Sequence, residues 1–105
     1  MSKTVHPLDI ILEKELQAAV RALAKLLGWT VFCTYDSRRS PEGEPDLRLV
    51  HPKLGRVVWA EIKREKGKLT DRQQEAILVL QEAGQEVYVW RPSSWAHIEK
   101  VLGGG

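Results

Sequence analysis

The sequence predicts a mixed α/β domain with the element order helix, three strands, helix, strand, helix. Two segments, residues 8–27 and 69–84, carry apolar side chains at helical spacing. Four shorter runs are rich in β-branched and aromatic residues and are separated by Gly, Pro and charged residues, as strands joined by turns are. A chain of 105 residues has room for one such domain with one modest core.

The N-terminal third predicts a helix followed by a strand and a loop. An apolar stripe favours an amphipathic helix from about Leu8 to Leu27, which Gly28 ends. The run WTVFCTY, residues 29–35, is typical of a strand. The segment DSRRSPEGEP, residues 36–45, combines Ser, Pro, Gly and charge, so we expect a loop there.

The middle of the chain predicts a β-hairpin. The alternating run DLRLVH, residues 46–51, leads into the turn sequence PKLG and then into the strand sequence RVVWAEIK, residues 56–63. The next five residues, REKGK (64–68), are four charged residues and a glycine, which favours a loop.

The second helix is predicted over residues 69–84. Thr70 and Gln73 have the spacing of a capping box at its start, and Gly84 ends it. The run QEVYVW, residues 85–90, then predicts a fourth strand.

The C-terminal end predicts a short helix and a tail. Ser94 can cap a helix that runs to Leu102, and the three glycines 103–105 are expected to form a flexible tail. Residues 1–102 are therefore expected to form the single domain.

The composition is that of a soluble globular protein, with 43% hydrophobic and 29% charged residues. The net charge of +2 is too small to indicate a nucleic-acid partner unless basic residues cluster locally. The single Cys33 cannot form an intrachain disulfide and is expected to be a buried, reduced thiol. With no signal sequence, no membrane-spanning run and no zinc-ligand spacing among the histidines, we expect a cytoplasmic protein without a zinc site.

The predicted hairpin collects charged side chains on one face. Because side chains alternate along a strand, Glu61 points away from the apolar residues on either side of it. Aligning the apolar faces of the two strands puts Asp46 on the same side as Glu61, since a one-residue slip would bury charges. The simplest register pairs His51 with Arg56 and brings Asp46 opposite Glu61. The charged face then carries Asp46, Arg48, Trp59, Glu61 and Lys63.

Two carboxylates that lie this close call for a cation. Directly opposed residues have Cβ atoms about 4.5–5.5 Å apart, and like charges at that distance destabilise a sheet. A divalent ion such as Mg²⁺ takes carboxylate oxygens and can activate a water for attack on a phosphate. Lys63 would point to the same place and could orient that water. The alternative is a solvated cluster of Asp46, Glu61 and Lys63 without a function.

The same residues carry a resemblance to a known family. Asp46 preceded by Pro45, followed by Glu61-Ile62-Lys63, matches the pattern of PD-(D/E)XK nucleases. The wider frame, with EKELQAAV, DSRRSPEGEPDL, AEIKREKGKLTDRQQ and AGQEVYVWRPS, resembles the VRR-NUC (virus-type replication-repair nuclease) domain in its small stand-alone phage form. The similarity runs from about residue 12 to the final helix. It implies a restriction-endonuclease-like αβββαβ core, with a mixed central sheet flanked by helices, and a phage or bacterial origin.

The resemblance assigns roles to four residues of the hairpin. Asp46 and Glu61 would be metal ligands for Mg²⁺ or Mn²⁺, and Ile62 would offer its backbone carbonyl to the same ion. Lys63 would be the catalytic lysine.

The family also uses a glutamate of the first helix, for which the sequence offers two candidates. Glu13 matches it better and Glu15 is the second choice; either could instead be a solvated first-turn glutamate favoured by the helix dipole. Gln73 aligns with a glutamine that related nucleases place near the site, although it can also serve the capping box. Gly43 is expected to shape the turn that delivers Asp46.

Basic residues flank the carboxylates on both sides. Contacts from such residues to phosphates position a duplex without reading its sequence, although exposed loops are often basic without any function. Of the four tryptophans, only Trp59 shares the charged face, and the other three are expected in the core or an interface. The expected DNA-binding residues are Ser37, Arg38, Arg39, Ser40, Arg64, Lys66 and Lys68.

The sequence and the resemblance together predict a metal-dependent DNA endonuclease. The stand-alone family members resemble Holliday-junction resolvases, so we expect a homodimer that acts on branched DNA in repair. Two alternatives remain: a flap or single-strand DNA nuclease, and a DNA-binding module whose metal site is vestigial.

Overall fold

The computed structural model describes residues 5–34 and 43–104, whose four strands form one mixed sheet. The spatial order follows the chain, and the strands are β1 (Thr30–Cys33), β2 (Leu47–His51), β3 (Arg56–Ile62) and β4 (Glu86–Trp90). The first three pair antiparallel, whereas β4 runs parallel to β3. A parallel pair needs a long crossover, and the segment with the second helix supplies it. The predicted mixed sheet is confirmed.

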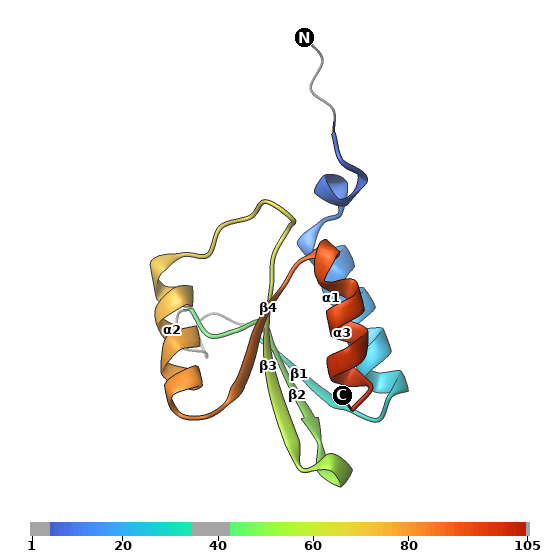
Figure 1. Cartoon of the computed structure of the whole chain (residues 1–105), viewed down its shortest axis with the longest axis vertical. Coiled ribbons are helices and arrows are strands. Elements are labelled where there is room, and N and C mark those ends of the chain that lie inside the picture. Colours follow the sequence, from blue (N-terminus) through green and yellow to red (C-terminus); the bar gives the residue numbers. More distant parts are fainter. Residues whose placement is uncertain (1–4, 35–42, 105) are drawn as a thin grey trace.

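Helices cover both faces of the sheet (Figure 1). The helices α1 (Glu13–Leu26) and α3 (Trp95–Leu102) lie side by side on one face, and α2 (Asp71–Glu82) lies on the other. Three short 3₁₀ turns, η1 (Pro7–Ile10), η2 (Pro52–Leu54) and η3 (Pro92–Ser94), join the longer elements. This arrangement confirms the α/β class and is consistent with a restriction-endonuclease-like core. Within the described part of the chain, no helix combines the length and apolar character needed to span a bilayer.

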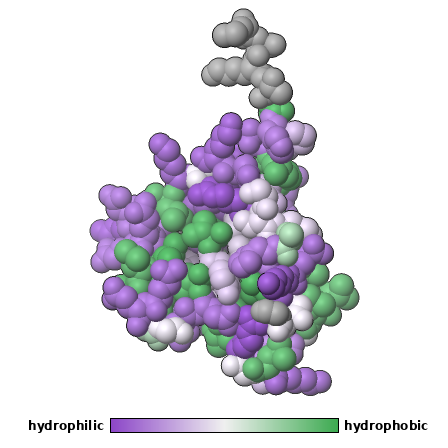
Figure 2. Space-filling model, viewed as in Figure 1, coloured by the Kyte–Doolittle hydropathy of each residue, from purple (hydrophilic) through white to green (hydrophobic). Residues whose placement is uncertain are grey.

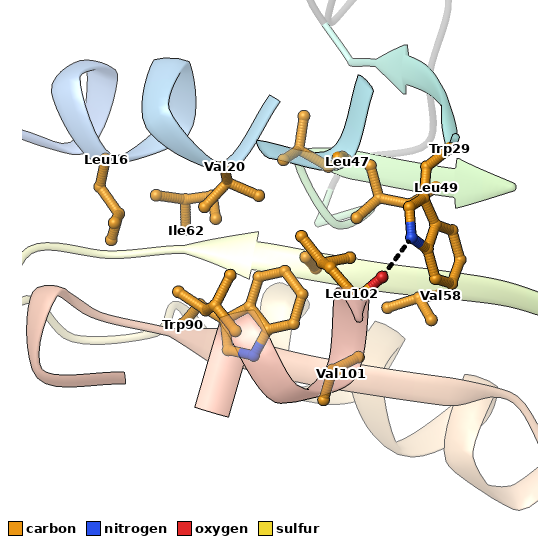
Figure 3. Close-up of a cluster of buried hydrophobic side chains, with 13 residues drawn as sticks. Leu16, Val20, Trp29, Leu47, Leu49, Val58, Ile62, Trp90, Val101 and Leu102 are labelled. Atoms are coloured by element: carbon orange, nitrogen blue, oxygen red, sulfur yellow. Dashed lines mark hydrogen bonds between the residues drawn. The ribbon is translucent and has the colours of Figure 1, made fainter. Parts of the chain in front are cut away.

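The main core lies between the sheet and the pair α1 and α3. The strands contribute the apolar residues that alternation assigned to one face, among them Leu47, Leu49 and Ile62, which are fully buried. Figure 3 shows Ile62 beside Val20 of α1, and Leu47 and Leu49 beside Trp29, whose indole donates a hydrogen bond to the Leu102 carbonyl (2.9 Å). Burying these side chains on one face leaves the other face of β2 and β3 available for charged residues.

The first helix begins later than the apolar spacing predicts. Residues Ile11 and Leu12 have extended backbones, so the predicted helix from Leu8 divides into η1 and α1. The carboxylate of Glu15 accepts a hydrogen bond from the Leu12 N–H (3.1 Å), which satisfies a free donor at the start of α1. The predicted start at Leu8 is therefore wrong, because a local cap interrupts a stripe that is continuous in sequence.

The role predicted for Ser94 is also wrong. Its side chain makes no capping bond to α3; instead its hydroxyl accepts from the Arg91 N–H (3.0 Å) and closes the turn η3. The helix α3 nevertheless begins at the next residue. Gly103 and Gly104 donate to carbonyls of Glu99 and Val101, so the tail begins with two residues bonded to the last turn of α3.

Gly43 marks a close approach between the turn before Asp46 and the start of α2. Its φ is +88°, and a Cβ at this position would lie 2.5 Å from the carbonyl oxygen of Arg72. Only glycine combines this backbone conformation with such a contact. The structural role predicted for Gly43 agrees with this geometry.

Replacing Gly43 with alanine is expected to lower the free energy of unfolding by about 2–3 kcal/mol, since it adds overpacking to backbone strain. Gly84→Ala is the matched control, because Gly84 has a similar φ of +80° but no atom within 4 Å of its Cβ position. Urea unfolding of both variants measures the difference. If both variants lose the same free energy of unfolding, the contact with Arg72 does not destabilise Gly43→Ala.

Candidate active site

The strand register brings Asp46 and Glu61 together. The pairs His51–Arg56 and Leu47–Ala60 set a register in which the next position places Asp46 across from Glu61. The Asp46 N–H donates to Glu61 Oε1 (3.2 Å), and the Ile62 N–H donates to Asp46 Oδ2 (2.9 Å). Each carboxylate is thus held by a backbone donor of the opposite strand, and the predicted register is confirmed.

The backbone before Asp46 is fixed by β1. The Thr34 N–H donates to the Asp46 carbonyl (2.9 Å), and the Thr34 hydroxyl donates to the Pro45 carbonyl (3.1 Å). Pro45 itself is fully buried. The carboxylate of Asp46 therefore projects from a rigid point at the end of the sheet.

Burial affects both carboxyl groups, with Glu61 buried and Asp46 half-buried. Glu61 is only 2% exposed. Burial raises the pKa of Glu61 to about 7, and the nearby charge of Asp46 acts in the same direction. Burial also raises the pKa of Asp46, against the opposing hydrogen bond from Ile62. Neighbouring carboxyl groups with raised pKa values mark a candidate functional site.

Lys63 and Gln73 complete the contacts of Glu61. The ammonium of Lys63, which is 9% exposed, lies 3.6 Å from Glu61 Oε2. The side-chain amide of Gln73 donates to the same oxygen (3.0 Å) from the first turn of α2. The same Gln73 forms the predicted capping box with Thr70, so the cap and the contact with Glu61 coexist.

The structure distinguishes the two glutamates of α1. Glu13 is exposed, and its charge raises the pKa of both Asp46 and Glu61, which places it within electrostatic reach of the pair. The carboxylate of Glu15 is instead bonded to the Leu12 N–H. Of the two, Glu13 is thus the one whose charge reaches the carboxylate pair, whereas Glu15 caps the helix.

The donors present suit a small, hard divalent cation. Asp46 and Glu61 offer carboxylate oxygens, and Mg²⁺ commonly binds through one or two carboxylates with water and phosphate completing its shell. Across residues 5–34 and 43–104, no three His, Cys, Asp or Glu side chains are grouped closely enough to hold a metal ion by themselves. Among the described residues, Asp46 and Glu61 therefore form a pair, and Glu13 does not complete a group of three with them.

The basic residues after Lys63 line an exposed loop at the same end of the sheet. Arg64, Lys66 and Lys68 are all exposed. Arg64 donates to the backbone carbonyl of Asp9 (3.2 Å) and Lys66 lies 3.3 Å from the Asp9 carboxylate, which ties the loop to η1. Figure 2 shows mainly polar side chains over this end of the molecule. The other predicted DNA-binding residues, Ser37, Arg38, Arg39 and Ser40, lie outside the described residues.

Arg91 is a residue of the site region that the sequence did not indicate. Its Nη1 donates to the carbonyls of Arg64 (2.8 Å), Glu65 (3.3 Å) and Gly67 (2.6 Å). The Ser93 N–H adds a bond to the Glu65 carboxylate (3.0 Å). Arg91 thus fixes the shape of the basic loop from the end of β4. No sequence signal could have found it, since its partners are backbone carbonyls.

Comparison with known proteins agrees with this geometry. The model of the VRR-NUC domain matches residues 3–93 of the 105-residue chain, a range that contains every residue of the site. No curated protein and no solved structure matches the chain significantly. A VRR-NUC domain implies a nuclease of the PD-(D/E)XK type, a superfamily that is typically metal-dependent. On the length of this match, the chain belongs to the VRR-NUC domain family.

Proposed function

We propose that the protein is a divalent-metal-dependent, structure-selective DNA endonuclease that acts like a Holliday-junction resolvase. The observation that carries the proposal is the directly opposed pair of the half-buried Asp46 and the buried Glu61, beside the buried Lys63. A sheet gains nothing from two like charges at this distance, and burial makes the pair more costly. A site that binds a cation explains the pair, whereas a solvated surface cluster does not.

The proposed mechanism assigns a task to each residue. Asp46, Glu61 and the main-chain carbonyl of Ile62 would hold Mg²⁺ or Mn²⁺, with Glu13 adding negative charge nearby. Such an ion, when bound, supplies an activated water and neutralises charge on the phosphate. The ammonium of Lys63 orients the attacking water and stabilises the negative charge that develops on phosphorus–oxygen bonds.

Gln73 would serve this mechanism as a positioning residue. Its amide holds Glu61 Oε2, while its own carbonyl is held by the Thr70 N–H. The rotamer of Glu61 is thereby coupled to the start of α2. A carboxylate with a fixed rotamer binds an ion with less loss of side-chain entropy.

The basic loop and a dimer would account for DNA binding. Arg64, Lys66 and Lys68 lie in the loop directly after Lys63 and offer phosphate contacts without base readout. One domain of this size covers too little surface for a four-way junction. A two-fold homodimer would present two sites to the two strands that a resolvase must cut.

Two alternatives are separated from this proposal by one experiment. A flap or single-strand nuclease would use the same site on another substrate. A DNA-binding module would bind DNA without cleaving it. The test incubates the protein with four-way junction, flap, duplex and single-stranded DNA, with Mg²⁺, Mn²⁺ or EDTA. Symmetric metal-dependent cuts in the junction support the proposal, and cleavage of flaps alone would favour the flap nuclease. If the protein cleaves none of these substrates with either metal, the DNA-binding module is the interpretation that remains.

Arg91 is expected to affect substrate binding more than chemistry. Arg91→Ala should raise KM for DNA by roughly tenfold with little change in kcat, because the loop that carries Arg64 and Lys66 loses its anchor. Steady-state cleavage kinetics separates the two constants. Arg91→Lys keeps a cation with several donors, so its KM should lie between those of wild type and Arg91→Ala. An unchanged KM in Arg91→Ala would show that DNA binding does not need the anchored loop.

A further inference from the structure

Part of the sheet is left uncovered on the side that α2 packs against. The helix α2 contacts β4, and Val87 of β4 and Glu61 of β3 are buried on this side. Farther from β4 the same side stays accessible: Phe32 is 45% exposed, Val57 is 36% exposed and Arg48 is exposed. We call this surface the open face; it consists of Thr30, Phe32, Arg48, Val50, Val57 and Trp59.

A row of three flat groups crosses the open face. Phe32, Arg48 and Trp59 are direct neighbours on β1, β2 and β3. The guanidinium carbon of Arg48 lies 4.7 Å from the centroid of the Phe32 ring and 5.6 Å from the Trp59 ring. The indole N–H of Trp59 donates to the side chain of Gln85 (3.2 Å), which fixes its plane. The row is therefore ordered before any ligand binds.

This row borders the carboxylate pair. Arg48 is two residues after Asp46 and Trp59 is two residues before Glu61, so all four share one side of the sheet. Two residues along a strand span roughly 7 Å. A nucleotide chain whose phosphate reaches Asp46 and Glu61 would have its next nucleotide over the row.

We propose that the open face binds an unpaired nucleotide next to the phosphate that is cleaved, an inference that rests on the proposed function. The nucleobase stacks on the row through the ring of Phe32, and Arg48 faces the phosphate chain. An exposed aromatic ring on the surface of a sheet is a common platform for single-stranded nucleic acids, because every base has a face that can stack. The guanidinium adds stacking and a charge of the correct sign.

The charge of the open face favours DNA over a second copy of the chain. Its six residues carry one cation and no acidic side chain. In an isologous dimer through this face, the same residues would meet across a two-fold axis, and Arg48 would be buried without a carboxylate partner. A phosphate chain supplies the missing negative charge.

The inference narrows the substrate class of the proposed nuclease. The strand that is cut must have at least one nucleotide free to leave the stack, as at a branch point, in a flap or in a single-stranded arm. A fully paired, regular duplex would have to unstack a base to use the open face, which costs a few kcal/mol. The open face would thus help to select DNA structure rather than sequence.

Fluorescence of 2-aminopurine tests the site without cleavage. A forked DNA with this base at the first unpaired position is titrated with protein in EDTA, beside a duplex that holds the same base paired. Wild-type protein should quench the forked probe as the base stacks. Phe32→Ala and Phe32→Leu should weaken its binding about tenfold and remove the quench, whereas Phe32→Tyr should keep both. Leu26→Ala, an exposed apolar residue of α1, is the control and should match wild type.

Each other outcome overturns one specific statement. If Phe32→Leu binds and quenches like wild type, or if wild type does not quench the forked probe but cuts DNA with Mg²⁺, the stacking site is wrong. If the Phe32 variants instead dissociate a dimer in light scattering while their quench is unchanged, the open face binds a second copy. A protein that quenches the probe in EDTA but cuts no DNA with Mg²⁺ or Mn²⁺ would retain the stacking site and overturn the proposed activity.

Discussion

Lys63→Met is expected to lower kcat for DNA cleavage by a factor of about 10²–10³ while leaving the affinity for DNA nearly unchanged. The ammonium lies 3.6 Å from Glu61 Oε2 and is almost fully buried, so in the proposed mechanism it would act on the reacting phosphate rather than attract DNA in general. Methionine keeps the length of the side chain and removes its charge. Single-turnover cleavage with saturating protein measures the chemical step, and fluorescence anisotropy in EDTA measures binding.

Lys53→Met provides the matched control for Lys63. Lys53 is an exposed lysine of η2, which connects the far ends of β2 and β3. Its removal changes the net charge equally and should leave the cleavage rate at the wild-type value. If Lys63→Met cuts as fast as Lys53→Met, Lys63 has no part in the chemistry. If its loss of activity follows a loss of affinity, Lys63 is a DNA-binding residue.

The metal-free protein is expected to lose stability as the pH rises from about 4.5 to about 7. The pKa of Glu61 is raised to about 7 in the folded protein, above its usual value of 4.5, so the folded state holds the proton more tightly. The contribution is full below pH 4.5 and is lost as the pH passes the folded pKa, which amounts to about 3 kcal/mol. Asp46 shifts in the same direction, and the two titrate as a pair.

Glu61→Gln isolates the contribution of Glu61 to the pH dependence of stability, because the amide does not titrate. Urea unfolding in EDTA from pH 5 to pH 8 should show a smaller decline in the free energy of unfolding for Glu61→Gln than for wild type. Mg²⁺ should restore stability to wild type at pH 8 by binding the ionised pair. Parallel pH profiles of the two proteins would contradict the raised pKa of Glu61.

Local rules were enough to predict the hairpin and its charged face. The tight turn after His51 and the apolar alternation of both strands allow one register, and that register alone places Asp46 across from Glu61. Local residues also predicted the start of α2, since Thr70 and Gln73 form the expected capping box. The mixed sheet was an expectation from the family resemblance, and the parallel pairing of β3 and β4 confirms it.

What the sequence could not show depended on contacts between distant segments or on competing local bonds. The apolar stripe of the first helix gives no sign of its break at Leu12, because Glu15 caps a backbone N–H there. The bond from Gln73 to Glu61 joins two elements across a loop, and the three bonds of Arg91 end on carbonyls that every residue has. The open face is visible only once α2 is known to leave β1 and β2 uncovered on its side.

The most direct test compares wild type with Asp46→Asn on a four-way junction. Asparagine keeps the size of the side chain and can still accept the hydrogen bond from the Ile62 N–H, but it removes one charge of the pair. We expect wild type to cut the junction with Mg²⁺ or Mn²⁺ and not in EDTA, and Asp46→Asn to cut at least about 10³-fold more slowly with either metal. Wild-type cleavage in EDTA, or equal rates for the two proteins with Mg²⁺, would contradict a metal-dependent active site at Asp46 and Glu61.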